Sequence, residues 1–246
     1  MRIRRFVLTS IVAAALPASA ANAQYFDVSP FLEQGQLLTG GHDHAGGSYP
    51  PPIRIYGYQF ADDPLDPYYP TDPGVNQASG VGHLPAGLPL RYSILSRLHD
   101  WDGSGSPALG APTGCVCLTL TMGASTRTLD PASAPQAGSL IQPVASDRSA
   151  HRHFVASLFA GPESSNVPAD PACLQPPLGI YASSLDLNLA DADTIHTSDP
   201  SRVLFNNGLS EEDHDALMHH IASSAIPEPG ALPFLARTPA MLRRRR

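Results

Sequence analysis

Hydrophobic side chains occupy every second position over several short segments of this chain, which is the period of a β-strand with one buried face. The clearest segment, residues 115–122, alternates Val, Leu, Leu and Met with Cys and Thr, and residues 185–189 alternate three Leu with Asp and Asn. Residues 53–60 are rich in β-branched and aromatic residues, which also favours a strand. Similar patterns predict further strands at 151–159 and 202–205, and one or two within 25–39.

The segments between these strands are rich in Pro, Gly, Ser and Asp, as over residues 49–52, 62–74 and 160–177. The 246 residues include 26 prolines, so long helices are not expected. Short strands separated by turns are typical of a sandwich of two sheets. The sequence therefore predicts a mainly β protein: an antiparallel β-sandwich, Ig-like or jelly-roll-like, with one short C-terminal helix.

That helix is predicted to begin after Ser210. Ser210 and Asp213 have the spacing of a capping box, and the acidic first turn complements the helix dipole. Four residues then follow at the i, i+3, i+4 and i+7 positions of one helical stripe: His214, Leu217, Met218 and Ile221. We expect this stripe to pack against the sandwich.

The two ends of the chain have a different composition from its middle. Residues 1–23 combine a basic start, an apolar run too short to span a bilayer and a small-x-small triplet, which together predict a cleaved secretory signal. Residues 223–246 contain Pro227-Glu228-Pro229, a mostly apolar stretch and four terminal arginines. We therefore divide the chain into a signal peptide (1–23), a β-sandwich domain (24–222) and a C-terminal tail (223–246).

The central part of the chain is strongly acidic. Residues 24–225 hold 21 of the 22 acidic residues but only seven of the 15 basic ones, a balance near −14. Such a surface repels nucleic acid and anionic lipid, so neither is expected as a partner. It suits divalent cations or simple solubility.

The three cysteines are Cys115, Cys117 and Cys173. In an exported protein an odd number allows one bridge with one thiol left over. Cys115 and Cys117 are two apart in a predicted strand and point to one face, so they are poorly placed to bridge each other. A bridge would therefore join Cys173 to one of them.

Two H-x-H motifs are the candidates for chemistry. His42 and His44 lie in a Gly-rich loop, whereas His151 and His153 begin a predicted strand. In a strand this spacing places both imidazoles on one face, about 6.5–7 Å apart at Cα, and neutral imidazole is a good ligand for zinc or copper. The other candidate ligands are His83, His99, His196 and His214. The alternative is that His151 and His153 are ordinary strand residues opposite an apolar face made by Phe154, Ala156 and Leu158.

Motifs of other functions are weak. Asp100-Trp101-Asp102-Gly103 begins like a calcium-binding loop, but position 12 is Ala111, so a plain turn is the better interpretation. The sequence has no G-x-S-x-G, H-E-x-x-H, Walker or G-x-G-x-x-G motif. We therefore expect a protein that is not an enzyme, with a secreted hydrolase as the third interpretation.

The tail resembles the PEP-CTERM sorting signal through Pro227-Glu228-Pro229, the apolar stretch 231–242 and the terminal arginines. The resemblance implies sorting by an exosortase, although Pro233, Arg237 and Pro239 interrupt the stretch that is continuous in that family. The alternative is a Pro-rich tail that ends in arginine.

The block His151-Arg152-His153-Phe154, followed by Gly179-Ile180-Tyr181, resembles zinc-repressor-controlled PEP-CTERM proteins and surface-anchored proteins linked to metal transport. That resemblance implies an extracytoplasmic β-sandwich associated with metal homeostasis.

These observations lead to one functional expectation and one alternative. We expect a secreted or cell-surface protein of the envelope or extracellular matrix that binds zinc through His151, His153, His42 and His44. Its expected partners are signal peptidase, exosortase, and envelope or matrix polymers, with membrane contact only transiently through the termini. The alternative is a structural or interaction module with no metal site.

Overall fold

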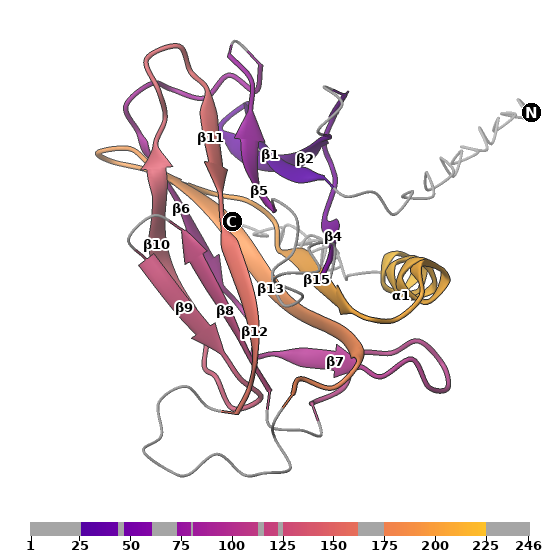
Figure 1. The fold of residues 1–246 in the computed structure, drawn as a ribbon. Coiled ribbons are helices and arrows are strands. Elements are labelled where there is room, and N and C mark those ends of the chain that lie inside the picture. Colours follow the sequence, from indigo (N-terminus) through magenta and orange to yellow (C-terminus); the bar gives the residue numbers. More distant parts are fainter. Residues whose placement is uncertain are drawn as a thin grey trace, which may run out of the picture.

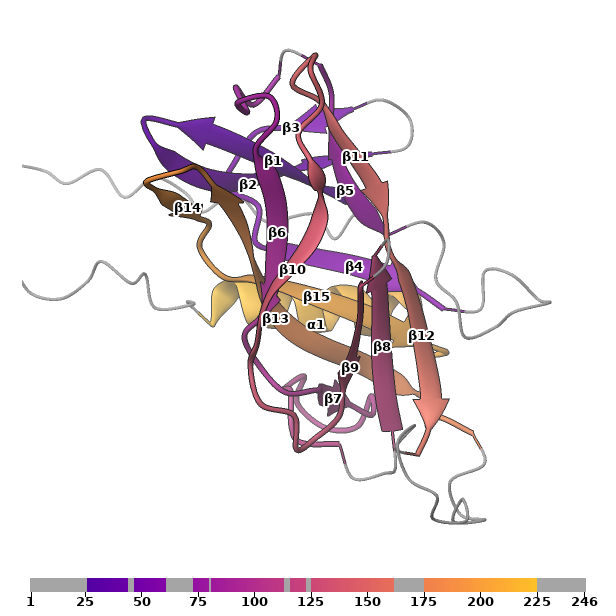
Figure 2. The same ribbon diagram turned by 90° about the vertical axis from the view of Figure 1, so that its left-hand side faces the viewer.

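A computed structural model describes residues 26–43, 47–60, 73–79, 81–112, 116–122, 125–161 and 175–224. Within these residues the chain forms three packed β-sheets and one helix (Figures 1 and 2). The predicted mainly β, sandwich-like class is confirmed. Two strand pairs are parallel, namely β1 (Asp27–Glu33) with β5 (Gly74–Gln77) and β15 (Ser201–Asn207) with β4 (Ile55–Gln59), whereas the other pairs of the described strands are antiparallel.

The first sheet has the strand order β11-β5-β1-β2-β3. Its strands are β11 (Ala150–His153), β5 (Gly74–Gln77), β1 (Asp27–Glu33), β2 (Gln36–His42) and β3 (Ser48–Tyr49). β1 and β2 form a hairpin whose two turn residues, Gln34 and Gly35, have φ angles of 49° and 82°. Positive φ at both positions is what a tight hairpin turn requires. The hairpin confirms two strands where one or two were predicted, and β2 extends to His42, which we had expected in a loop.

The second sheet has the order β10-β6-β13-β15-β4. Its strands are β10 (Gln136–Pro143), β6 (Pro89–Ile94), β13 (Gly179–Ala190), β15 (Ser201–Asn207) and β4 (Ile55–Gln59), and two short strands, β7 (His99–Trp101) and β14 (Ile195–Thr197), also pair with β13. The alternating leucines predicted at 185–189 lie in β13 with their side chains buried. The long strand β13 therefore organises this sheet.

The third sheet has the order β12-β8-β9, formed by β12 (Val155–Ala160), β8 (Val116–Met122) and β9 (Ser125–Leu129). The single strand predicted at 151–159 is wrong, because it divides at Phe154 into β11 and β12, which belong to different sheets (Figure 2). The backbone N–H of Phe154 donates to Pro73 at 2.8 Å, and its buried ring meets Tyr58 edge-on at 5.8 Å. The chain thus changes sheets where an aromatic side chain enters the shared core.

The main core lies between the three sheets. A small apolar cavity is lined by Val28 and Val75 from the first sheet, Leu185 from the second and Leu120 from the third. Phe154, Ala156 and Leu158 are all buried, as the sequence predicted. Because all three sheets contribute to one core, the first sheet, which carries the two histidines on its edge strand, packs against the other two.

Helix α1 (Glu211–Ser223) covers the outer face of the second sheet beside β15 and β4 (Figure 1). The predicted cap is confirmed: the Asp213 N–H donates to Ser210 Oγ at 3.1 Å. The predicted stripe His214, Leu217, Met218 and Ile221 is also confirmed as the buried face. Across the described part of the chain, no helix is both long and apolar enough to cross a bilayer.

Some expectations fall on residues outside the described ranges. These are the signal segment 1–23, nearly all of the tail 223–246, His44, Cys115 and Cys173. Cys117 lies in β8 and is buried. The division of the chain at residue 222 and the cysteine pairing stay predictions.

Candidate metal centre

His151 and His153 lie on β11, an edge strand of the first sheet. β11 runs antiparallel to β5, with His151 opposite Asn76 and His153 opposite Gly74. The two imidazoles lie on the same face, as the H-x-H spacing predicted, and their Nε2 atoms are 2.6 Å apart. His151 is exposed and His153 is partly buried. The motif therefore forms a pair of nitrogen atoms that solvent reaches.

The distance between these nitrogens defines what the pair does chemically. At 2.6 Å one imidazole donates its N–H to the other, and the tautomers decide which of the two is the donor. Two nitrogens that bind one tetrahedral zinc, with bonds of about 2.0–2.1 Å, lie about 3.3 Å apart. Metal binding would replace the hydrogen bond between the rings and would require the two nitrogens to separate by only about 0.7 Å. The pair is thus close to the geometry of a two-nitrogen metal ligand set.

The side chain of Gln142 positions the strand that carries the pair. With its amide oriented to satisfy both groups, Gln142 donates to the carbonyl oxygen of His151 and accepts from the N–H of His151, both at 2.9 Å. Gln142 lies on β10 of the second sheet. Its amide completes the backbone hydrogen bonds of an edge strand and so holds β11 against the neighbouring sheet.

The register of the first sheet places one row of residues across four strands. His153 is opposite Gly74, Val75 aligns with Val28, and Asp27 is opposite His42. Directly opposed residues share a face, so His153, Asp27 and His42 all project from the same side of the sheet. His42 is three strand spacings from His153, about 14 Å between Cα atoms. The structure therefore brings His151 and His153 together but not His42.

Asp27 is the residue of this row that sequence reasoning missed. Its side chain is only 1% exposed, and its Oδ2 accepts from Nδ2 of Asn76 at 3.3 Å. A Cβ on Gly74 would lie 3.1 Å from Oδ1 of Asp27 and 3.2 Å from the Cα of His153. The carboxylate thus leans over Gly74 toward β11. In the sequence, no local signal separates Asp27 from the other acidic residues.

Three of the other candidate ligands, His196, His214 and His99, have local environments of their own. Nδ1 of His196 lies 2.7 Å from the carbonyl oxygen of Gly35. Burial lowers the pKa of His214, which lies on the buried face of helix α1, and burial likewise lowers the pKa of His99 on β7. Among the described residues, no three His, Cys, Asp or Glu side chains converge closely enough to hold a metal ion.

The segment that begins like a calcium-binding loop forms a turn, as expected. Asp100 lies in β7, and Oδ1 of Asp102 accepts from the N–H and the hydroxyl of Ser104 at 2.9 and 2.6 Å. These hydrogen bonds lower the pKa of Asp102. Its carboxylate is thus directed at its own backbone, as in a common Asx turn.

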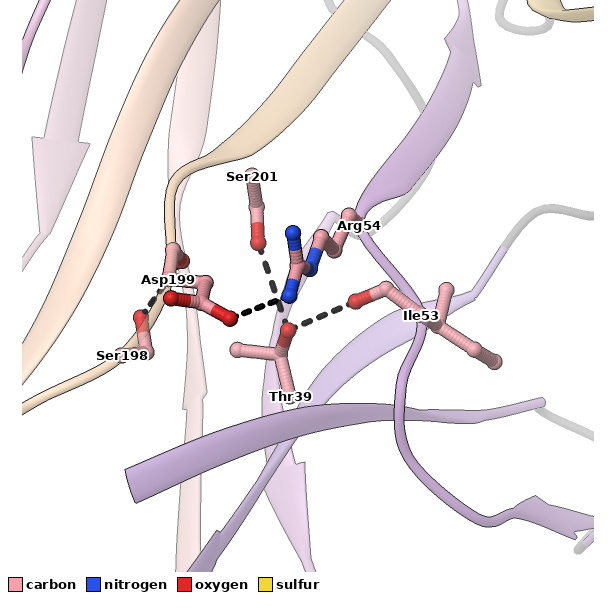
Figure 3. Close-up of polar contacts among 6 residues, drawn as sticks. All are labelled: Thr39, Ile53, Arg54, Ser198, Asp199 and Ser201. Atoms are coloured by element: carbon pink, nitrogen blue, oxygen red, sulfur yellow. Dashed lines mark hydrogen bonds and ion pairs between the residues drawn. The ribbon is translucent and has the colours of Figure 1, made fainter. Parts of the chain in front are cut away.

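A second polar cluster joins the first and second sheets (Figure 3). Arg54 forms an ion pair with Asp199. The hydroxyl of Thr39 donates to the carbonyl oxygen of Ile53 at 2.6 Å. The same hydroxyl lies 3.3 Å from the hydroxyl of Ser201. Thr39 lies on β2 and Ser201 on β15, which belong to different sheets. The residues drawn include no imidazole that would activate either hydroxyl. We interpret this cluster as a structural junction.

No protein-family model matches this chain, and searches of curated proteins and of solved structures find no match either. The histidine pair is therefore interpreted from its geometry alone.

Proposed function

We propose that this is an exported, non-enzymatic cell-surface or extracellular-matrix protein that binds a transition metal, in the first place zinc, through His151 and His153. The observation that carries the proposal is the 2.6 Å approach of two Nε2 atoms on an exposed edge strand. A binding site at the surface of an extracytoplasmic protein is open to metal in the surrounding medium. Signal peptidase, exosortase and matrix polymers are the partners that fit such a protein.

The ligand chemistry supports a borderline metal rather than calcium or magnesium. Neutral imidazoles favour zinc, copper and nickel, whereas calcium and magnesium prefer oxygen ligands. The excess of acidic over basic residues in 24–225 adds a negative potential that concentrates cations near the surface. Both features support metal capture, and the nitrogen pair supports zinc or copper as the metal.

Zinc titration of the purified full chain by calorimetry, with elemental analysis, tests this proposal. We expect about one zinc per chain in the wild type and loss of that zinc in the variant His151→Ala/His153→Ala. The variant His219→Ala/His220→Ala is the matched control, because it removes two neighbouring imidazoles from helix α1 instead. No zinc in the wild type, or equal zinc in both double variants, would contradict the proposal.

The alternative function is a structural or interaction module of the envelope. The observation in its favour is that the two imidazoles satisfy each other by a hydrogen bond without a metal. A wild-type chain that binds neither zinc nor copper would support this alternative.

The export part of the proposal is tested separately, by deletion of residues 226–246. If the tail is a sorting signal, the truncated protein will change its location between cell surface and medium. An unchanged distribution would contradict sorting by the tail without bearing on metal binding.

A further inference from the structure

The apolar cavity between the three sheets has polar side chains at one end. Its lining includes Tyr92 of β6 and Leu120 of β8. Tyr92 is directly opposite Ser139 of β10. Leu120 is directly opposite Arg127 of β9. Directly opposed residues share a face, so Ser139 and Arg127 project from the same sheet faces as the residues that line the cavity.

Side chains join β9 and β10, the edge strands of two different sheets, which lie side by side (Figure 1). Nε of Arg127 donates to Oγ of Ser139 at 2.5 Å, and its Nη2 donates to the carbonyl oxygen of Ala137 at 3.4 Å. Nε2 of Gln136 donates to the carbonyl oxygen of Thr128 at 2.8 Å. Because these contacts are made by side chains, a ligand can enter here without breaking a strand ladder.

Three hydrogen-bond donors gather at this end of the cavity. The hydroxyl of Tyr92 is buried and makes no hydrogen bond with any described residue. Ser139 is 3% exposed and accepts from Arg127, so its own O–H remains available as a donor. Burial raises the pKa of Tyr92, whereas the neighbouring Ser139 and the charge of Arg127 oppose that shift, so both groups are close to the phenol.

The charge of Arg127 also lacks a counterion. Among the described residues the ion pair found joins Arg54 to Asp199, so Arg127 has no carboxylate partner. A guanidinium binds a carboxylate through parallel hydrogen bonds, and more strongly beside an apolar core than in water. A buried hydroxyl without a partner is costly, and an oxygen atom of a ligand would remove that cost. Charge and hydrogen bonding therefore both favour an anionic oxygen ligand.

The rest of the cavity favours hydrocarbon. Apart from Tyr92, its lining is entirely apolar: Val28, Val75, Leu120, Met122, Ile141, Phe154, Leu185 and Leu187. The cavity has room for about one water-sized group, and a water molecule there would find few polar partners. A methyl or methylene group suits it better, and the flexible side chain of Met122 can yield to a slightly larger one.

We propose that this protein binds a short-chain aliphatic carboxylate, of the size of propionate or butyrate, between β9 and β10. Arg127 pairs with the carboxylate, the hydroxyls of Ser139 and Tyr92 donate to its oxygens, and the hydrocarbon end enters the cavity. This site is independent of the proposed metal site, which lies on β11 at the edge of the first sheet.

Calorimetric titration of the full chain with sodium butyrate tests this inference. We expect saturable binding to the wild type and about tenfold weaker binding to Arg127→Gln. Arg91→Gln is the matched control, because Arg91 also donates to a carbonyl oxygen of β10, that of Gly138 at 3.0 Å, but lies on the opposite face from Tyr92. No binding to the wild type, or equal affinity in the two variants, would overturn the inference.

The charge and the length of the ligand give further readouts. Butylamine has the same hydrocarbon chain with the opposite charge and should not bind. Acetate should bind more weakly than butyrate, by about fourfold for each methylene group that enters the cavity. Val75→Ile fills part of the cavity and should weaken the binding of butyrate more than that of acetate. Equal affinity for butylamine and butyrate, or for acetate and butyrate, would contradict the inference.

A measurement on the wild type covers the case in which Arg127→Gln does not fold. Met122 lines the cavity, whereas Met218 lies in the apolar cluster of helix α1. In the full chain labelled with carbon-13 at the methionine methyl groups, butyrate should shift the NMR signal of Met122 and leave that of Met218 in place. A shift at Met218 alone, or at neither residue, would overturn the inference.

Discussion

Helix α1 docks on the second sheet through a contact that a single methyl group should disrupt. The ring of His214 lies directly over Gly57 of β4: a Cβ at position 57 would lie 2.5 Å from Cε1 of His214, 2.8 Å from its Nε2 and 3.0 Å from Sδ of Met218. A Cβ atom essentially never approaches another heavy atom as closely as the first two of these contacts, so the ring of His214, or the helix that carries it, would have to shift. The φ of Gly57 is not in the left-handed region, so the backbone itself accepts alanine.

The magnitude for Gly57→Ala follows from two opposing effects. Adding a methyl group to a packed interface typically costs about 1–3 kcal/mol. Replacing glycine inside a strand returns about 0.5–1 kcal/mol, because the unfolded chain loses flexibility. We therefore expect Gly57→Ala to lower the free energy of unfolding by about 0.5–2 kcal/mol.

Removing the imidazole should reverse that effect. In a His214→Ala background the methyl group has room, and the flexible Met218 side chain can yield, so Gly57→Ala should be neutral or stabilise by up to about 1 kcal/mol. The difference between the two backgrounds is the coupling free energy of positions 57 and 214, which we expect to be about 1–3 kcal/mol.

Urea unfolding of the wild type, the two single variants and the double variant measures this coupling. Trp101 is the only tryptophan of the chain and lies in the apolar cluster beneath helix α1, so its fluorescence reports on the docked helix. An equal cost of Gly57→Ala in both backgrounds, or no cost in the wild type, would refute the proposed contact.

Three further predictions concern the helix and the metal pair. Burial lowers the pKa of His214, with the charge of Asp215 opposing this shift, so the unfolded state binds the proton more readily. The stability of the fold should therefore be full above the unfolded pKa of about 6.5 and fall as the pH drops below it. The variant His214→Leu should reduce the difference in urea midpoint between pH 7.5 and 5.5. Ser210→Ala removes the N-cap oxygen and should lower the free energy of unfolding by about 1 kcal/mol. Thermal unfolding followed by circular dichroism measures this loss, and the control Ser210→Asp, which keeps an oxygen at the N-cap, should leave the stability unchanged. Zinc at a hundred times its dissociation constant should stabilise the wild type by about 2.7 kcal/mol, and an unmoved melting temperature would contradict the site formed by His151 and His153.

The features that the sequence predicted well depend on neighbouring residues. The helix is an example, because its cap and its buried stripe are set by residues within four positions of one another. The leucine alternation in β13 is another, because period two requires only one buried face. Local patterns of this kind suffice to identify the mainly β class.

Most of the features that were missed depend on contacts between distant segments, although β6 alternates buried and half-buried side chains and its local pattern was missed as well. β9 and β10 have few buried side chains, so neither shows a clean alternation. The division of residues 151–159 at Phe154 has no turn residue to mark it, because tertiary packing against Tyr58 determines where the chain changes sheets. The parallel pairing of β1 with β5 joins strands that are more than forty residues apart in the chain.

The candidate site shows both kinds of feature. Two residues of one strand, His151 and His153, share a face whatever that strand pairs with, so their common face could be predicted from spacing alone. The position of Asp27 depends instead on the registers of two strand pairs, β11 with β5 and β5 with β1. A slip of one residue in either pairing would turn Asp27 to the opposite face from the histidines. Gly74 is the residue on which both registers meet, and its missing side chain is what lets the carboxylate of Asp27 approach the backbone of His153.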